Sequence, residues 1–249
     1  MSRFDRFVGI ARSLAIYHAI PWRQSHMRRL YAGFVKSGDL VFDIGAHAGN
    51  RTRGFAALGC RVIAVEPQPD FARLLRALFR RSSRVEIVEA AAGARAGYAS
   101  LSISDRTPTV TTLADGWRDA RAREPGFDGV RWNRRIEVET TTLDLLISRW
   151  GMPAFVKIDV EGAEPAVFGG LTQAVPALSF EYVPAALGEV RACLDRLATL
   201  GTYLFNWSAG ESFRLASPSW LTSTPLLESL GSPAGRKRPG DVYARLIPF

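Results

Sequence analysis

Residues 39–50 of this chain read DLVFDIGAHAGN. An apolar run contains the acid Asp43 near its end, a turn of small residues follows, and residues 51–58 have a helical pattern. Gly45 and Gly49 carry no Cβ, so the backbone of the turn can approach a ligand closely. A buried strand that leads through a tight turn to a helix N-terminus is typical of nucleotide-like ligand sites in open α/β sheets. Ordinary βα connections share this pattern, so the rest of the chain has to decide between them.

Strand and helix patterns alternate along the rest of the chain. Strands are predicted at 61–66, 85–88, 154–159, 177–182, 203–207 and 242–246, the last of them antiparallel beside the strand before it. Helical spacing predicts helices at 71–79, 143–150, 163–168 and 187–200. This alternation is the pattern of a mostly parallel sheet with helices on both faces, so the predicted fold class is α/β.

An N-terminal extension precedes this alternation. Residues 1–37 predict two helices, at about 4–18 and 24–35, with Pro21 between them. The extension is predicted either to pack on the core or at a homodimer contact, or to present a basic amphipathic face to an anionic membrane or over the site. Residues 38–249 then form one domain.

An insertion at about 105–133 separates two predicted strands at 98–104 and 136–141. The insertion is rich in Arg, Asp, Gly, Pro and Thr, a composition common in loops that contact substrate or are mobile. The polar segment after Trp207 predicts a short strand at 213–215 and a short helix near 220–230. These segments are expected to shape a binding pocket.

The chain is strongly basic. Its formal net charge is +8 and its sequence pI is about 10.1, which raises nucleic acid or an anionic membrane as partners. Only Lys36, Lys157 and Lys237 are lysines, and arginine and alanine abound together along the chain. This indicates a compositional bias as much as a binding surface, so nucleic acid is not the favoured partner.

Cysteine usage and hydropathy predict a cytoplasmic protein. Cys60 and Cys193 lie far apart in apolar surroundings and are expected to be reduced, buried thiols. No apolar run approaches the ~20 residues of a membrane span. Arg12 interrupts the first apolar patch, which argues against a signal peptide. Peripheral membrane contact through residues 1–20 is the alternative.

Three acids, Asp43, Glu66 and Asp159, lie at or near the ends of predicted strands. The carboxyl ends of parallel strands share one edge of a sheet, where ligands bind. Glu66 follows Gly45 at the spacing at which an acid can accept hydrogen bonds from both ribose hydroxyls of an adenosine group. Pro67 sets the turn behind it.

The turn after Asp43 lacks the glycines of a dinucleotide site. A dinucleotide site would carry Gly-x-Gly-x-x-Gly at this turn, but in this chain position 47 is His and position 50 is Asn. The central glycine that lets a pyrophosphate approach the helix is missing, so a ligand without phosphate fits better. S-adenosylmethionine is such a ligand, and Asp43 would suit its ammonium and sulfonium charges directly or through water.

A second informative stretch, residues 156–164, reads VKIDVEGAE. Strand alternation places Lys157 and Asp159 on one face. A lysine in a central strand is unusual unless it is paired or functional. Asp159, with Glu161 and Gly162 just beyond it, is expected to border the reactive end of the cofactor.

Four motifs together resemble the FkbM family of S-adenosylmethionine-dependent methyltransferases. They are DIGAHAG at 43–49, VEP at 65–67, AG at 92–93 and KIDVEGAE at 157–164, and the resemblance covers about residues 38–185. It implies a Rossmann-like, seven-stranded methyltransferase fold and methylation of a hydroxyl on a sugar, glycolipid or natural product. Family members often have Asn where His47 stands.

The resemblance also implies roles for single residues. Gly45, His47 and Gly49 would form the cofactor turn, Glu66 would hold the ribose, Ala91–Gly93 would lie by the adenine and Asp159 by the methyl group. The cofactor-binding residues predicted in total are Asp43, Gly45, His47, Gly49, Asn50, Glu66, Pro67, Ala92 and Asp159.

Methyl transfer to a hydroxyl needs a group that removes the proton, either a side chain or a metal that lowers the hydroxyl pKa. The catalytic candidates are Asp159, Lys157 and Glu181. Asp159 and Glu181 end adjacent strands and can together bind Mg²⁺ through oxygen. The metal-free reaction is preferred, because a third clear acidic ligand is missing.

Two alternative functions stay open. The net charge suggests an RNA methyltransferase, but residues 159–162 read DVEG where base-modifying enzymes commonly carry Asp/Asn-Pro-Pro-aromatic. The amphipathic N-terminus suggests a non-catalytic membrane-surface or partner-binding protein that keeps the fold.

Overall fold

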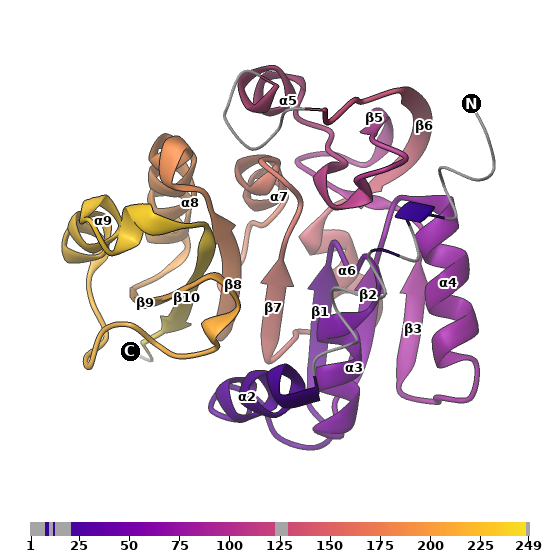
Figure 1. The fold of residues 1–249 in the computed structure, drawn as a ribbon. Helices are drawn as coiled ribbons and strands as arrows, with labels where there is room; N and C mark the ends of the chain where they lie inside the picture. Colours follow the sequence, from indigo (N-terminus) through magenta and orange to yellow (C-terminus); the bar gives the residue numbers. More distant parts are fainter. Residues whose placement is uncertain (1–7, 10–11, 13–20, 123–128, 248–249) are drawn as a thin grey trace.

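The computed structural model describes residues 8, 9, 12, 21–122 and 129–247 (Figure 1). The helix predicted at 4–18 falls almost wholly outside the described residues. The second predicted helix, α2, spans Pro21–Tyr31 and so begins and ends earlier than the predicted 24–35. Proline is well suited to a first helical position, because the N–H that it lacks has no partner there.

The central sheet has seven strands in the order β3-β2-β1-β7-β8-β10-β9. The strands are β1 (Leu40–Ile44), β2 (Arg61–Val65), β3 (Val85–Val88), β7 (Phe155–Ile158), β8 (Ala177–Tyr182), β9 (Tyr203–Ala209) and β10 (Gly240–Leu246). Only β10 is antiparallel to its neighbours, β8 and β9. The predicted Rossmann-like α/β sheet with an antiparallel last strand is therefore confirmed, and β10 also lies between β8 and β9.

Helices cover both faces of this sheet, as predicted. On one face, α2 and α3 (Asn50–Ala57) pack through Tyr31 and Phe55 on Val41 and Phe155, and α4 (Pro69–Phe79) lies beside them. The other face is covered by α6 (Leu143–Trp150), α7 (Glu164–Gly169), α8 (Leu187–Leu200) and α9 (Ser223–Gly231). The chain winds from β1 to one side and returns through β7 to the other, so the topological switch lies between β1 and β7.

A second, three-stranded sheet has the order β4-β6-β5. Its strands are β4 (Ala91–Ala92), β5 (Gly97–Ile103) and β6 (Arg134–Thr141), and β5 and β6 pair antiparallel. The two strands predicted to flank the insertion are thus confirmed. Within the insertion lie the short helix η1 (Pro108–Val110) and α5 (Asp115–Arg121). Figure 1 shows these elements above the carboxyl ends of β1 and β7.

The segment after β9 differs from the prediction in one place. No strand forms at 213–215, because Phe213 adopts a left-handed turn after η3 (Gly210–Ser212) and buries its ring beneath the guanidinium of Arg51. The edge strand β9 is instead covered through paired backbone hydrogen bonds between Phe205 and Leu221. The predicted helix near 220–230 is confirmed as α9.

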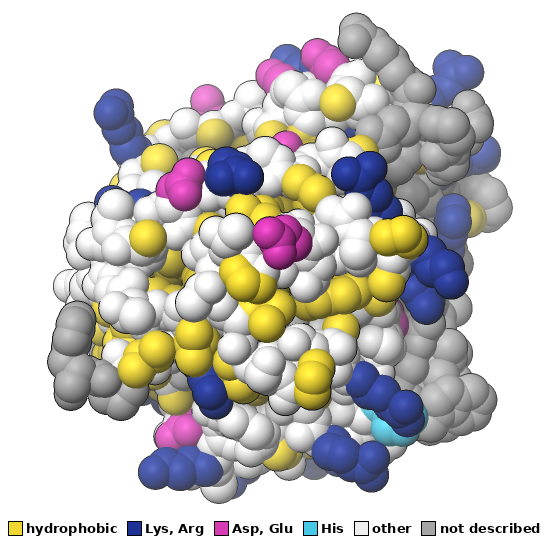
Figure 2. Space-filling view, turned by 90° about the vertical axis from the view of Figure 1, so that its left-hand side faces the viewer, with side chains coloured by type: hydrophobic (Ala, Val, Ile, Leu, Met, Phe, Trp, Pro, Cys, Tyr) yellow, Lys and Arg dark blue, Asp and Glu magenta, His cyan; other side chains and the backbone are white. Residues whose placement is uncertain are grey.

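The surface that contains α8, α9 and the β9 edge is mixed in character. Figure 2 shows hydrophobic side chains across its middle and scattered lysine and arginine side chains, most of them towards the periphery. Among the described residues, none of the helices combines the length and the hydropathy needed to span a bilayer.

Candidate active site

A cavity opens at the carboxyl ends of the parallel strands, at the switch point between β1 and β7. It is lined by most of residues 45–51, 65–68, 90–92, 108–113 and 159–163, together with Leu101, Glu181 and Glu211. Seven of the nine predicted cofactor-binding residues are in this lining: Gly45, His47, Asn50, Glu66, Pro67, Ala92 and Asp159. The structure therefore brings together residues from four of the predicted motifs.

Gly45 brings the ends of β1 and β7 into contact. Its φ is 79°, and a Cβ at this position would lie 1.8 Å from the carbonyl oxygen of Asp159. Both the left-handed backbone and the close approach require glycine. His47 is also left-handed, with a φ of 45°. Histidine is one of the residues that are enriched in this conformation, so it can adopt the turn without a glycine.

The side chain of His47 is packed against a neighbouring helix. Its ring stacks on Phe71, with centroids 4.1 Å apart and planes at 30°. Burial lowers the pKa of His47 to about 3, so the ring is neutral at pH 7. The side chain therefore adds no positive charge to the cavity.

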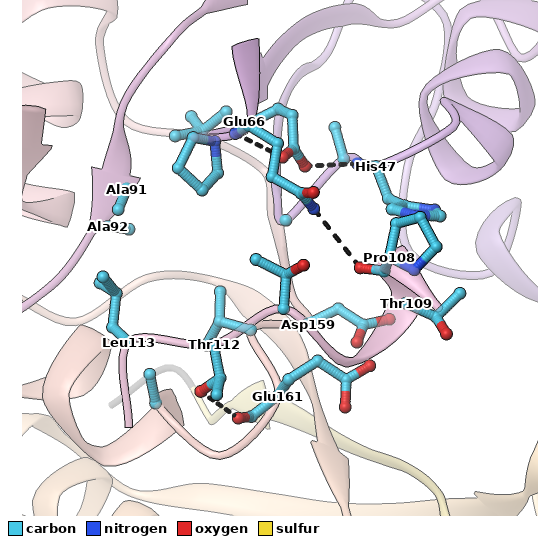
Figure 3. A pocket seen from close by; sticks show the side chains of 18 of the residues that line it. His47, Glu66, Ala91, Ala92, Pro108, Thr109, Thr112, Leu113, Asp159 and Glu161 are labelled. Atoms are coloured by element: carbon cyan, nitrogen blue, oxygen red, sulfur yellow. Dashed lines mark hydrogen bonds between the residues drawn. The ribbon is translucent and has the colours of Figure 1, made fainter. Parts of the chain in front are cut away.

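Glu66 directly follows strand β2, and backbone N–H groups on the side away from the cavity hold its carboxylate in place. Oε2 accepts a hydrogen bond from the N–H of His47 and Oε1 accepts one from the N–H of Gln68, each at 2.8 Å. Burial raises the pKa of Glu66 to about 7, although these two hydrogen bonds oppose the shift. Figure 3 draws both hydrogen bonds at the edge of the cavity. When ionised, each carboxylate oxygen has a further lone pair for a ligand.

Three other predicted cofactor residues have distinct places. Asp43 is buried behind the cavity wall and accepts a hydrogen bond from Thr52 Oγ1 at 2.5 Å, so it is not among the lining residues. Gly49 is likewise outside the lining and packs beneath Leu75 of α4. Asn50 begins α3 at the cavity, and its side-chain oxygen accepts a hydrogen bond from Gln24 of α2.

The insertion supplies a wall of the cavity that single residues of the sequence did not predict. Pro108, Thr109, Thr112 and Leu113 face the cavity with Glu66 and Ala92 (Figure 3). The segment is tied to the core, because Gln68 Nε2 donates to the carbonyl of Pro108 at 3.4 Å and Thr112 Oγ1 donates to the carbonyl of Glu161 at 2.7 Å. Its composition was informative, but no periodicity distinguished these positions.

Three carboxylates meet at the other end of the cavity. Oxygen atoms of Asp159, Glu161 and Glu181 lie within 4.8 Å of one another. Burial, with the neighbouring carboxylates, raises the pKa of Glu161 and of Glu181 well above the usual value. The expectation that a third acidic ligand is missing was wrong. Glu161 takes that place through left-handed φ angles at Glu161 and Gly162, which turn the chain back and which residue spacing does not reveal.

Lys157 lies behind this end of the cavity and is fully buried. Its Nζ is 2.9 Å from Oδ1 of Asp241 and 3.2 Å from Oδ2 of Asp159. Burial lowers the pKa of Lys157, but the two carboxylates outweigh it and hold the pKa above its usual value. The raised pKa favours the ammonium form of Lys157, which argues against its predicted role as the base that removes a proton.

The comparisons with known proteins agree with this arrangement. Residues 43–196 match the model of the methyltransferase FkbM domain. No curated protein matches the chain.

Solved structures with similar folds include three methyltransferases. A TehB-like S-adenosylmethionine-dependent methyltransferase from Corynebacterium glutamicum is 10% identical, with a TM-score of 0.47 over 95% of this chain and 94% of that chain. An O-methyltransferase from Bacillus cereus in complex with S-adenosylhomocysteine is 13% identical, with a TM-score of 0.44 over 96% and 87%. A precorrin-6y C5,15-methyltransferase from Geobacter metallireducens is 14% identical, with a TM-score of 0.42 over 92% and 87%.

The family model covers more than half of the 249 residues and includes the β1 turn, Glu66 and the Asp159 stretch. The chain therefore belongs to the FkbM methyltransferase family and is an S-adenosylmethionine-dependent methyltransferase.

Proposed function

We propose that the enzyme transfers the methyl group of S-adenosylmethionine to a hydroxyl of a neutral, hydroxyl-rich acceptor, such as a sugar, a glycolipid or a natural product. The observation that carries this proposal is the cluster of carboxylates opposite the Glu66 end of the cavity. Within the part of the chain that the structure describes, neither Glu161 nor Glu181 has an ion-pair partner. In their ionised form these carboxylates accept hydrogen bonds from hydroxyls and repel anions, and in the protonated form that their raised pKa favours they also donate to hydroxyls.

The other half of the cavity fits the adenosine part of the cofactor. We assign the ribose hydroxyls to Glu66, because its carboxylate is fixed from behind and faces the cavity. The small side chains of Ala91 and Ala92 leave room for a flat adenine. We assign the methionine part to the turn at Gly45 and to Asn50, and the methyl group to the side of Asp159, because all three residues line the cavity.

In the proposed reaction, the acceptor oxygen attacks the methyl carbon in line with the carbon–sulfur bond, which breaks to release S-adenosylhomocysteine. The acceptor proton passes to Asp159 or Glu181. Lys157 binds only Oδ2 of Asp159, so Oδ1 is left for the acceptor. Holding the oxygen in line and removing its proton are the contributions that these side chains can make.

The positive charge of the chain gives little support to a nucleic-acid acceptor at this cavity. Among the described lining residues, the only lysine or arginine is Arg51, and both ends of its guanidinium bind Glu211, at 3.1 and 2.9 Å. Within the described part of the chain, a phosphate in the cavity would meet carboxylates and no uncommitted cation. RNA therefore stays the weaker alternative, and a steep loss of RNA binding between low and moderate salt would revive it.

A separate question is whether a divalent cation takes part in the reaction. Asp159, Glu161 and Glu181 offer the hard oxygen donors that Mg²⁺ prefers, so the residues fit such an ion. A bound ion would lower the pKa of the acceptor hydroxyl. We keep the metal-free reaction as the proposal, because the ammonium of Lys157 lies 3.2 Å from Asp159 and opposes a second cation there.

The experiment starts with calorimetry of the purified protein against S-adenosylhomocysteine. Failure to bind would favour the non-catalytic alternative. Transfer of a labelled methyl group is then measured with panels of neutral, amino and phosphorylated sugars and polyols, and methylation of phosphorylated acceptors alone would overturn the proposal. Unchanged activity in EDTA is expected, and loss of activity that Mg²⁺ restores would establish the metal-dependent reaction instead.

Glu181→Gln separates chemistry from cofactor binding. Loss of a general base lowers kcat by about 10²–10⁴-fold, while the affinity for S-adenosylhomocysteine stays unchanged, because Glu181 lies outside the adenosine half. Asp159→Asn is measured beside it. Full activity in both variants would remove these two carboxylates from the reaction.

Two proposals on partners concern the N-terminal extension. We propose peripheral membrane contact through residues 1–20 and a homodimer. Co-sedimentation with vesicles of anionic lipid, compared with neutral lipid, tests the first. Analytical ultracentrifugation tests the second, and a monomer across the concentration range would exclude it.

A further inference from the structure

Five charged side chains of alternating sign run from one side of the cavity to the other. Glu211 binds Arg51, Arg51 lies 3.8 Å from Asp241, Asp241 lies 2.9 Å from Lys157, and Lys157 lies 3.2 Å from Asp159. Glu211, Arg51 and Asp159 line the cavity, and Asp241 and Lys157 are buried behind it. Three carboxylates and two cations therefore connect the segment after β9 with the proposed reaction centre.

Asp241 occupies the middle of the row. It is the second residue of β10, directly opposite Glu181 of β8 in the sheet register, and it is 5% exposed. Burial would raise the pKa of Asp241, but Lys157 and Arg51 hold it below its usual value. The residue lies outside the segment that matches the family model, and neither its spacing nor its neighbours in sequence indicated a role.

The ammonium of Lys157 is shared between two carboxylates. Nζ donates hydrogen bonds to the carbonyl of Ile158 at 3.0 Å and to Oδ2 of Asp159, and it forms an ion pair with Oδ1 of Asp241 at 2.9 Å. Because Asp241 shares the ammonium, Lys157 binds a single oxygen of Asp159. Without the charge of Asp241, a fully buried ammonium would keep Asp159 as its one anionic partner. It would then draw both oxygens of Asp159 towards itself and away from the cavity.

We propose that Asp241 is a positioning residue for methyl transfer, which holds Lys157 between two carboxylates and so keeps one oxygen of Asp159 turned towards the acceptor. The inference rests on the proposed role of Asp159. It assigns Asp241 no contact with substrate or cofactor, since it is not in the cavity lining. The inference also assigns a role to Lys157, the buried lysine of the KIDVEG stretch: it orients Asp159 and does not remove the proton.

The kinetic test compares Asp241→Asn with two further variants. Asp241→Glu keeps the charge, and Asp195→Asn is a matched control on the exposed surface of α8. Small displacements of reacting groups can cost about 10²-fold in rate, so kcat of Asp241→Asn is expected to fall by about 10- to 100-fold. KM for S-adenosylmethionine and affinity for S-adenosylhomocysteine should stay within about threefold, because the Glu66 half is untouched. Partial recovery of kcat is expected for Asp241→Glu, and no change for Asp195→Asn.

A second readout needs no acceptor. The chain has three lysines, and Lys36 and Lys237 are exposed, so a slowly exchanging ammonium signal in ¹⁵N NMR belongs to Lys157. This signal should move or broaden in Asp241→Asn and stay in Asp195→Asn. A crystal structure of Asp241→Asn with S-adenosylhomocysteine should show both oxygens of Asp159 turned to Lys157.

The outcomes separate the inference from the proposed function. An unchanged Lys157 signal and an unchanged Asp159 orientation in Asp241→Asn overturn the positioning role, whatever the activity. A loss of cofactor affinity as large as the loss of kcat also overturns it, in favour of a general structural role.

If no hydroxyl acceptor is methylated, the proposed function fails, while the NMR signal and the crystal structure still decide how Asp241 acts on Lys157 and Asp159. If Asp241→Asn does not fold, Asp241→Glu decides. A fall of kcat in that variant while the Lys157 signal stays as in the wild type would overturn the inference, because the loss would then not act through Lys157.

Discussion

The two halves of the cavity are built by different means. The half around Glu66 consists of backbone turns, small side chains and one carboxylate held by two N–H groups. The half around Asp159 consists of carboxylates, two of which are balanced by cations, the buried Lys157 and the cavity-lining Arg51. The first half is assembled from residues that closely follow strands β1, β2 and β3, with the wall of the insertion beside them. The second also needs β8, β10 and the segment after β9. The cofactor end therefore depends on local geometry, whereas the acceptor end depends on charges that the whole sheet brings together.

Gly45→Ala should have the largest effect, because it disturbs the contact on which both halves rest. A non-glycine residue in the left-handed region costs about 1–3 kcal/mol, and the new Cβ would overlap the carbonyl oxygen of Asp159 at 1.8 Å. We expect the free energy of unfolding in urea to fall by more than about 2 kcal/mol, with no measurable cofactor binding.

Gly188→Ala is the matched control for this variant. Gly188 lies in α8 with nothing within 4 Å of an added Cβ, so it should stabilise the protein by about 0.5–1 kcal/mol. Wild-type stability in Gly45→Ala would show that the β1 and β7 ends need not touch.

Glu66→Gln should have the next largest effect and should be confined to the cofactor half. Hydrogen bonds to charged groups contribute about 1.5–3 kcal/mol, which corresponds to a loss of about 10- to 100-fold in affinity for S-adenosylhomocysteine by calorimetry. The exposed variant Glu228→Gln should bind like the wild type. An unchanged affinity in Glu66→Gln would place the ribose elsewhere.

Proton uptake by Glu66 predicts a pH dependence of cofactor affinity. Burial raises the pKa of Glu66 to about 7, so the carboxyl is protonated below that pH and loses its capacity to accept two ribose hydrogen bonds. Affinity for S-adenosylhomocysteine should therefore fall as the pH drops from 8 to 6, by up to about tenfold per unit. Glu66→Gln should show a flat profile, and an equal slope in both proteins would assign the titration to another group.

The difference between the two halves of the cavity also explains which site residues could be predicted from the sequence. Glu66 and Asp159 follow their strands directly, so strand patterns and spacing placed them at one sheet edge, and the core strands lie close to their predicted positions along the chain. Asp241 was missed, because its contact with Lys157 exists only through the insertion of β10 between β8 and β9. Glu161 was not counted as a third acid, because a left-handed turn reverses its direction. Local patterns carry no information about either event.

Thr112→Val should have the smallest effect, and it asks how strongly the two halves are coupled. Thr112 Oγ1 donates to the carbonyl of Glu161 at 2.7 Å and accepts from the N–H of Ala114 at 2.9 Å, so it ties the wall of the insertion to the acidic turn. Valine keeps the shape and removes both bonds, each worth about 0.5–1.5 kcal/mol. We expect the free energy of unfolding to fall by about 1–2 kcal/mol and KM for the acceptor to rise by up to about tenfold.

Thr109→Val is the control for this last variant, because Thr109 lines the same wall and no hydrogen bond of its side chain is seen within the described residues. It should change neither quantity. Affinity for S-adenosylhomocysteine separates two models. If it stays within about threefold of the wild type in Thr112→Val, the cofactor half is independent of the acidic turn, as its construction from backbone turns suggests. If it falls as much as acceptor binding, the insertion acts on both halves together, and the division of the cavity into a local part and a long-range part does not hold.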